Sequence, residues 1–258
     1  MRLYRSVILL VPALLSLASA PARAQTPATV VLERLTWTEI RGALRAGKTT
    51  VIVPVGGTEQ SGPYIAVGKH NVRVAVQAER IARALGNALV APVLAYVPEG
   101  GIDPPTEHMR FPGTISVPAA AFEQILEAAA ESFRAHGFTD VVLLGDHGGY
   151  QANLQAVAGR LERRWARSHA HAIFVADYYR AVASGGHADL DDTSLMLATD
   201  PALVRARQLR AAPPPGAADG VYGADPRRAG AERGRTLADA QVARAVQAIR
   251  RATSRRAP

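Results

Sequence analysis

Side chains that can bind a metal ion follow three short apolar runs in this sequence of 258 residues. Glu59 and His70 come after the first run, His147 after the second, and His187 and Asp192 after the third. If these runs are parallel strands, their carboxyl ends share one edge of a sheet, and the side chains can meet in one cleft. Imidazole and carboxylate together are typical ligands of Zn²⁺, Mn²⁺ or Fe²⁺, and not of Ca²⁺. The pattern therefore predicts a metal site.

Ordinary structural roles account for some of the same residues. The segment Gly145–Gly149 has the composition of a tight turn between a strand and a helix, with Asp146 as the helix N-cap. Asp191 and Asp192 equally suit the start of a following helix. Three histidines are assigned to the surface or to a helix end and left out of the site: His136, His169 and His171. The residues alone predict an α/β protein with a metal cleft and leave its reaction open.

Alternating apolar runs and helical stripes in the sequence predict the strands and helices that position these candidate residues. Short, uniformly apolar or β-branched runs predict buried strands at residues 49–55, 88–94, 141–144 and 173–176. Apolar residues at helical spacing predict helices at 36–47, 71–85, 122–133, 154–165 and 237–251. Strands that are apolar throughout and alternate with helices are typical of a mostly parallel sheet covered on both faces. The expected fold class is α/β.

The N-terminus has the composition of a secretory signal peptide. A basic start precedes an apolar run from Val7 to about Ala20, and Ala22-Arg23-Ala24 supplies a small-x-small cleavage site. The run is short for a membrane span, which needs about 20 apolar residues, although an uncleaved anchor is the alternative. We expect a signal peptide at 1–24, a secreted or periplasmic location, and a single domain at 25–258. The chain has no cysteine, so no disulfide supports it.

The formal charge of +8 is concentrated at the two ends of the chain. Residues 201–258 carry 12 arginines and a local charge of +8, and the leader carries three more arginines, which leaves −3 for residues 25–200. Aromatic residues are not interleaved with the basic ones, as they are on many nucleic-acid surfaces. We expect no nucleic-acid partner, no stable membrane insertion after leader removal, and a solvated basic tail at the C-terminus.

Several segments, in this order and spacing, resemble the creatininase (creatinine amidohydrolase) family over about residues 32–250. They are Pro54–Tyr64 (PVGGTEQSGPY), Glu107–Ser116 (EHMRFPGTIS), Gly145–Tyr150 (GDHGGY), Gly186–Ser194 (GHADLDDTS) and Gly223–Ala229 (GADPRRA). The resemblance implies a creatininase-like three-layer αβα fold and one or two divalent metals. It also implies hydrolysis of a C–N bond in a small amide substrate by a homo-oligomer, often a hexamer.

The resemblance also implies roles for single residues. Glu59 and His147 match metal ligands, and His187 matches a histidine near the substrate that can carry a proton. Asp192 matches the glutamate of the family's E-T-S segment. The candidates for substrate contact are Ser61, His108 and Tyr150.

Two departures from the family pattern bear on the number of metal ions. Ser61 stands where the family has a ligand histidine, and His70 stands where it has an aspartate that bridges two metals. A neutral imidazole bridges two metals poorly. We therefore expect one Zn, Mn or Fe ion per subunit, bound by Glu59, His70 and His147, with Asp192 or Asp146 completing the shell.

The expected function is a metal-dependent amidohydrolase that cleaves the C–N bond of a small cyclic or linear amide with water activated by the metal. Asp146 or Asp192 would take the proton of the water, and His187 would pass one to the leaving nitrogen. One alternative is an exported small-molecule binding protein or pseudoenzyme with a degraded metal site. Another is a metal-free esterase using Ser61, which lacks the surrounding G-x-S-x-G elbow. Creatinine itself is not predicted as the substrate, because its recognition depends on loops outside the matched segments.

Overall fold

The computed structural model describes residues 28–182 and 185–254. The predicted signal peptide and the last four residues lie outside this part of the chain. Within it, four parallel strands form a sheet in the order β2-β1-β3-β4. The strands are β1 Thr50–Val55, β2 Ala88–Val90, β3 Asp140–Gly145 and β4 His171–Phe174. The prediction of an α/β fold with a mostly parallel sheet is confirmed.

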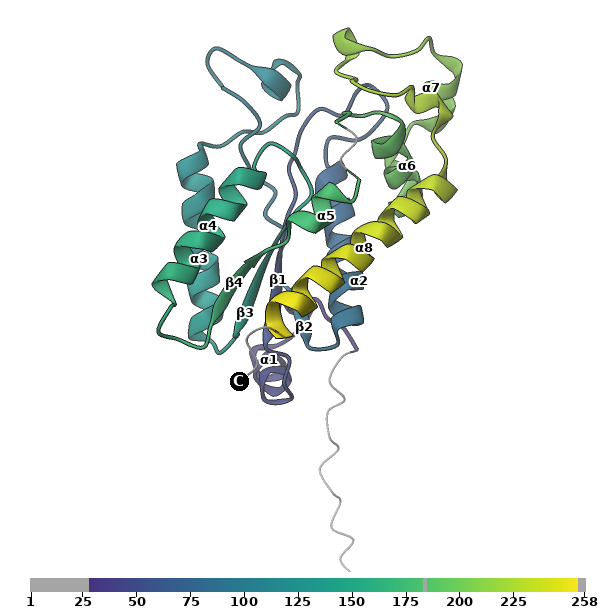
Figure 1. Ribbon diagram of the computed structural model, residues 1–258. Coiled ribbons are helices and arrows are strands. Elements are labelled where there is room, and N and C mark those ends of the chain that lie inside the picture. Colours follow the sequence, from purple (N-terminus) through teal and green to yellow (C-terminus); the bar gives the residue numbers. More distant parts are fainter. Residues whose placement is uncertain (1–27, 183–184, 255–258) are drawn as a thin grey trace, which may run out of the picture.

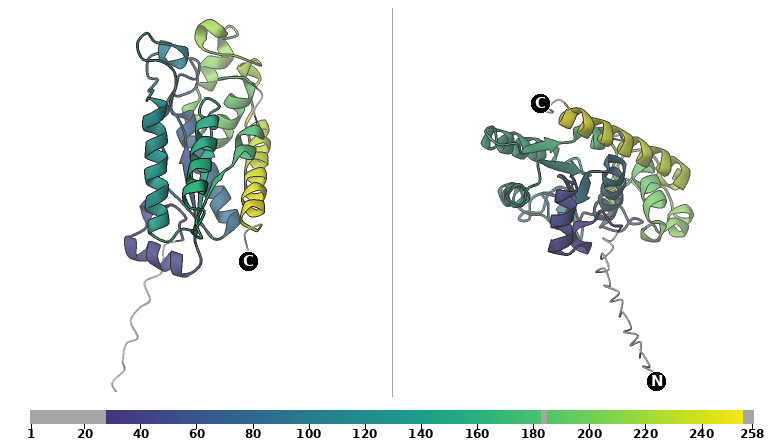
Figure 2. Two further views of the ribbon diagram at one scale, coloured as in Figure 1. Left: turned by 60° about the vertical axis from the view of Figure 1, so that its left-hand side comes forward. Right: turned by 90° about the horizontal axis from the view of Figure 1, so that it is seen from below.

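Helices alternate with the strands along the chain. They are α1 Trp37–Arg45, α2 Lys69–Leu85, α3 Ala119–Ala135, α4 Gln151–Arg164, α5 Ala176–Arg180, α6 Leu190–Thr199, α7 Ala206–Ala211 and α8 Ala231–Ser254. Short 3₁₀ turns are η1 Leu32–Arg34, η2 Glu107–Arg110, η3 Pro201–Leu203, η4 Ala217–Asp219 and η5 Pro226–Arg228. Helices α3 and α4 lie on one side of the sheet and α2, α5 and α8 on the other, which makes three layers (Figure 1, Figure 2).

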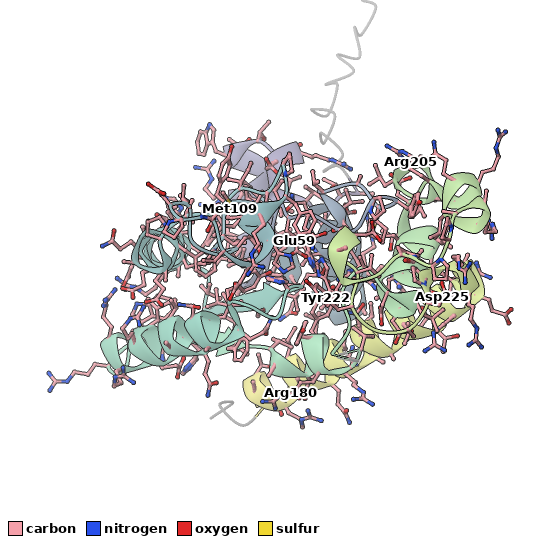
Figure 3. All side chains as sticks on the ribbon, turned by 90° about the horizontal axis from the view of Figure 1, so that it is seen from above. Glu59, Met109, Arg180, Arg205, Tyr222 and Asp225 are labelled. Atoms are coloured by element: carbon pink, nitrogen blue, oxygen red, sulfur yellow. The ribbon has the colours of Figure 1, made fainter. Side chains whose placement is uncertain are left out.

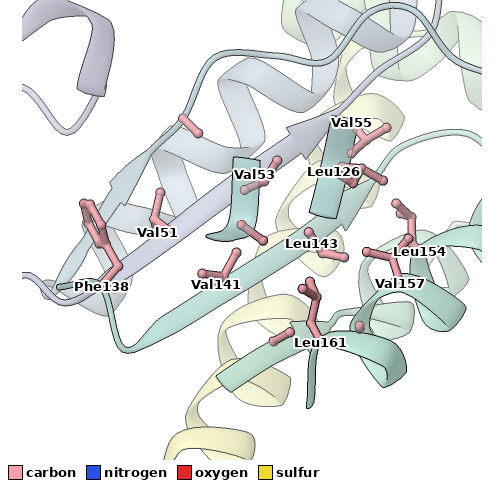
Figure 4. Close-up of a cluster of buried hydrophobic side chains, with 14 of the residues drawn as sticks. Val51, Val53, Val55, Leu126, Phe138, Val141, Leu143, Leu154, Val157 and Leu161 are labelled. Carbon is pink, nitrogen blue, oxygen red and sulfur yellow. The ribbon is translucent and has the colours of Figure 1, made fainter. Parts of the chain in front are cut away.

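The side chains of β1 show why both faces are covered. Val51, Val53 and Val55 belong to the core cluster that includes α3 and α4, where they pack with residues such as Leu126 (Figure 4). Ile52 belongs to the opposite cluster, with α2 and α8. Because successive side chains of a strand point to opposite faces, a strand that is apolar throughout needs a helical layer on each side.

Strands β2 and β4 end earlier than predicted. β2 ends at Val90 instead of Leu94, because Pro92 has no N–H to donate to a ladder. The chain returns to β1 afterwards, where the N–H of Leu94 donates to the carbonyl of Pro54 at 3.0 Å. β4 ends at Phe174, since Ala176 already opens α5.

The prediction of a solvated basic tail is wrong for α8. This helix begins at Ala231, earlier than the expected Leu237, and contacts α2, α5 and α6. Its residues Ala245 and Ile249 are fully or almost fully buried in the core. Most of its arginines remain exposed, so the local positive charge is the outer face of a packed helix.

Gly234 allows α8 to approach α6 closely. A Cβ atom at this position would overlap the carbonyl oxygen of Ser194, which is backbone and cannot rotate away. We therefore expect Gly234→Ala to lower the free energy of unfolding by about 1–3 kcal/mol, measured by urea denaturation. Gly42 in α1 is the matched control, because a Cβ there meets nothing within 4 Å. Gly42→Ala is expected to stabilise by up to about 1 kcal/mol, and equal effects of the two changes would contradict the packing argument.

The sheet has a crevice at the carboxyl ends of its two central strands. The chain leaves β1 towards β2 on one side and leaves β3 towards β4 on the other, so the connections that follow these two strands diverge at this point. Ligands of open α/β sheets bind at such a position. Residues 91–118 and 185–230 lie at this end of the molecule (Figure 1). None of the described helices is both long enough and apolar enough to span a membrane.

Candidate metal centre

Four potential metal ligands meet beyond the carboxyl ends of β1 and β3. Glu59 follows β1 and His147 follows β3, whereas Glu99 and His108 come from the long segment between β2 and α3. One donor atom from each of the four lies within 4.8 Å of the others. Figure 3 shows this edge of the sheet from above, with Glu59 near the middle of the molecule. The prediction that chain-distant acids and imidazoles converge here therefore agrees with the geometry for Glu59 and His147.

Several donor atoms of this group are buried without a hydrogen-bond partner. In the described part of the chain this applies to Oε2 of Glu59, both carboxyl oxygens of Glu99 and Nδ1 of His147. The two glutamates are 0% and 1% exposed. An unpartnered buried polar atom costs about 1–3 kcal/mol, and more if it is charged. One divalent cation would give these atoms a common partner, so the residues present fit a metal with nitrogen and oxygen ligands.

Glycines after both strands make room for the donors. A Cβ on Gly57 would lie 2.6 Å from Oε1 of Glu99, and a Cβ on Gly149 would lie 2.9 Å from the ring of His147. Gly57 also has φ 150°, a conformation that other residues adopt rarely. The glycines after β1 and β3 therefore leave space for the side chains of Glu99 and His147, in addition to forming the turns.

Burial sets the charge of the four potential ligands. Burial, together with the nearby carboxylate of Glu59, raises the pKa of Glu99 to about 10. Burial lowers the pKa of His147 to about 3 and also lowers the pKa of His108. Burial alone would raise the pKa of Glu59 too, but neighbouring charges, that of Lys69 foremost, hold it well below its ordinary value. At neutral pH the imidazoles are thus uncharged, which is the form that binds a metal.

A network of buried ion pairs adjoins this group at the start of α2. Nζ of Lys69 lies 2.7 Å from Oδ2 of Asp192 and 3.3 Å from Oε1 of Glu59. Arg73, one turn later, contacts Oδ1 of Asp192 at 2.8 Å and Oδ2 of Asp146 at 2.7 Å. Burial lowers the pKa of Lys69, but the carboxylates of Asp192 and Glu59 outweigh it and raise the pKa above its ordinary value. Both cations are therefore charged at neutral pH.

The predicted ligands His70 and Asp192 lie in this network and not in the four-donor group. Nε2 of His70 is 2.7 Å from Oε1 of Glu59, and Nδ1 is 2.7 Å from Oδ2 of Asp146, so both ring nitrogens face carboxylates. The oxygens of Asp192 are taken by the two cations and by the backbone N–H of Ala188. In the described structure, Glu99 and His108 complete the four-donor group in place of these two predicted ligands.

Asp146 does not face the cleft with a free oxygen either. Its Oδ1 accepts a hydrogen bond from the hydroxyl of Tyr178 at 2.7 Å, and its Oδ2 is contacted by Arg73 and His70. The placement of Asp146 and Asp192 therefore gives no support to either as the general base. The predicted N-cap role of Asp146 is wrong, because the N-cap of α4 is Tyr150. Asp191 and Asp192 do lie in the first turn of α6, but its N-cap is Asp189.

Two of the residues predicted to contact substrate are buried and bonded to the backbone. Ser61 is 1% exposed, and its hydroxyl donates to the carbonyl of Glu59 at 3.3 Å. Tyr150 is fully buried, and its hydroxyl shares its proton between the carbonyls of Val55 and Gly56. These contacts hold the loop after β1 in place, and they leave neither hydroxyl open to a ligand. His108, the third candidate, lies in the four-donor group and also lines the cavities described next.

His187 lies between the four-donor group and solvent. It lines two cavities, of about 190 and 580 Å³, that also share His108. Its Nε2 lies 2.9 Å from the carbonyl oxygen of Gln60 and 3.0 Å from the side-chain amide nitrogen of Gln60, so this ring nitrogen has both an acceptor and a donor within reach. Nδ1 lies 3.6 Å from Oε1 of Glu59. Burial and the charge of Lys69 lower the pKa of His187 to about 4, so the ring is neutral at pH 7.

Two important residues were missed by the sequence analysis. Glu99 lies between Pro98 and Gly100 in a segment without periodicity, and only a glycine pair nearby in the sequence, which Glu59 also has, could have indicated it. Lys69 precedes His70 and has the sequence context of an ordinary solvated lysine.

Comparison with known proteins places these residues in a family context. A family model described as creatininase, creatinine amidohydrolase, matches residues 33–249. The mycofactocin precursor peptide peptidase of Mycolicibacterium smegmatis is 36% identical over 114 residues, 42% of each chain. The 3-dehydro-scyllo-inosose hydrolase of Thermotoga maritima is 30% identical over 125 residues, 48% of this chain and 38% of that protein. The chain thus spans about two fifths of the length of these two relatives.

A creatinine amidohydrolase of Pseudomonas putida is 27% identical over 201 residues, which cover 68% of this chain and 74% of that protein. Among solved structures, a crystal structure of creatinine amidohydrolase has a TM-score of 0.73 at 24% identity and covers 87% of this chain and 98% of the other. A structure described as Creatininase Mn has a TM-score of 0.70 at 25% identity, with 86% and 98% covered. A mutant creatininase described as Zn-Zn type has a TM-score of 0.69 at 24% identity, with the same coverage.

Proposed function

Because the chain belongs to the creatininase family, we propose that it is a metal-dependent hydrolase that cleaves the C–N bond of a small cyclic or linear amide. The observation that carries the proposal is the group of Glu59, Glu99, His108 and His147, in which four donor atoms are buried without a hydrogen-bond partner and whose two histidines line a cavity. Relatives named as a peptidase, a hydrolase and an amidohydrolase support hydrolysis and leave the substrate open.

Each residue of the site has a proposed task. Glu59, Glu99, His108 and His147 hold a Zn²⁺, Mn²⁺ or Fe²⁺ ion, which when bound lowers the pKa of a water molecule from about 16 towards 7 and polarises a carbonyl group. His187 accepts a proton from the attacking water at Nδ1 and returns it to the leaving nitrogen, because Asp146 and Asp192 are committed to ion pairs. This task needs the tautomer with its proton on Nε2, which the carbonyl of Gln60 can accept.

Removal of the metal tests the proposal directly. The protein reconstituted with Zn²⁺ or Mn²⁺ is expected to hold about one ion per chain by elemental analysis. Chelation is expected to abolish hydrolysis of a panel of small amides, lactams and formamides, because the activated water is lost, and re-addition of the metal is expected to restore it.

The alternatives give different results in the same experiment. A protein that takes up no metal at micromolar supply and turns over no amide would be a binding protein or pseudoenzyme. Turnover that survives complete chelation would favour the metal-free mechanism through Ser61.

A further inference from the structure

We infer that the ammonium group of Lys69 takes the place of a second metal ion in this centre and limits it to one divalent cation. The inference rests on the proposed function, since it concerns the same site. It follows from the way in which the carboxylate of Glu59 divides its two oxygens and from the complete burial of Lys69.

The two oxygens of Glu59 face different groups. Oε2 points to the four-donor group, where it lies 3.1 Å from Nε2 of His108 and 3.4 Å from Nε2 of His147. Oε1 lies 3.3 Å from Nζ of Lys69. A carboxylate with a metal position at one oxygen and an ammonium at the other has the arrangement of a carboxylate that bridges two cations.

The surroundings of Nζ are those of a cation site. Oxygens of two carboxylates, Glu59 and Asp192, lie 3.3 and 2.7 Å away, and His70 contacts the same oxygen of Glu59 at 2.7 Å. Carboxylate oxygens are ligands that divalent metals bind readily. The side chain of Lys69 is 0% exposed, and lysines are almost never buried to this extent unless they are paired. The ammonium thus fills a position that would otherwise attract a metal ion.

The balance of charge agrees with a single ion. A ligand carboxyl binds a metal only in its ionised form, so the loaded centre and its network contain four carboxylates and two fixed cations. One divalent ion brings this sum to zero before any charge on His70 is counted, and a second would leave at least two uncompensated positive charges among buried groups, which is costly. The groups counted are Glu59, Glu99, Asp146 and Asp192, with Lys69 and Arg73.

The number of bound ions in Lys69 variants tests this inference. We expect Lys69→Ala to bind about one Mn²⁺ per chain more than the wild type when both are saturated with Mn²⁺ and counted by elemental analysis. Its electron paramagnetic resonance spectrum is expected to show an exchange-coupled Mn pair instead of an isolated ion. Lys69→Arg is the matched control, because it keeps a cation at this position and is expected to keep the wild-type count and spectrum.

Each outcome is decisive. Equal counts in Lys69→Ala and the wild type would overturn the inference, and so would a coupled pair in the wild type. If Lys69→Ala does not fold, the wild-type spectrum decides, since an isolated Mn²⁺ supports the inference. A wild type that binds no ion, with a Lys69→Ala variant that gains one, would support the role of Lys69 and contradict the proposed function.

Discussion

His147→Ala is expected to lose metal binding and hydrolysis together while the protein remains folded. His147 is 14% exposed at its side chain and supplies one of the four donors, so its removal breaks the ligand group without opening the core. Loss of the metal removes several kcal/mol of transition-state stabilisation, and about 4 kcal/mol corresponds to a fall of about 10³-fold in turnover. The measurements are elemental analysis, kcat for a responsive amide, and far-UV circular dichroism for the fold.

His169→Ala is the matched control for this change. His169 is exposed and follows α4 on the chain, outside the site, and its replacement is expected to leave the metal content and turnover at wild-type values. A His147→Ala protein that keeps its metal and its activity would refute the assignment of this histidine, and with it the proposed centre.

His187→Ala is expected to lower kcat by about 10²–10⁴-fold, the usual contribution of a general acid or base, and to leave the metal content unchanged. The reason is geometric. His187 lines both cavities and is proposed to take up a proton at Nδ1, but it does not belong to the four-donor group. Both kcat and the metal content of the variant are measured, because the proposal requires kcat to fall and the metal content to stay the same.

His136→Ala serves as the control for His187, since His136 is the exposed C-cap residue of α3. A His187→Ala protein with normal kcat would exclude a proton-carrying role. Loss of the metal from His187→Ala would instead show that His187 is a ligand or that its ring holds Glu59 in place.

The sheet was predictable from sequence because its strands are short apolar runs with helices on both sides. The order of these elements and most of their bounds follow from that periodicity. Bounds failed where a local feature interrupts the pattern, as at Pro92 beyond β2. The packing of α8 could not be predicted from its charge, because arginines on its outer face conceal a buried stripe that includes Ala245 and Ile249.

The candidate site was predictable where a residue directly follows a strand. Glu59 and His147 come just after β1 and β3, so the parallel sheet alone brings them to one edge. Glu99 belongs to a segment of irregular structure, and periodicity says nothing about the path of such a segment. His70 and Asp192 were expected to bind the metal because their types suit it. Asp192 instead pairs with the buried Lys69, which composition does not reveal, and His70 lies between the carboxylates of Glu59 and Asp146.

The pairing of β1 with β3 places Val55 opposite Gly145, and both Glu59 and His147 follow within a few residues of that pair. A shift of one residue along a strand displaces the chain by about 3.3 Å, a large part of the 4.8 Å that encloses the four donors. Because both faces of these strands are apolar, their hydrophobic pattern opposes such a slip only weakly. Affinity for the ion therefore reports whether β1 and β3 pair in the native register, which secondary-structure content does not. A compact chain with these two strands out of register would not bind the ion.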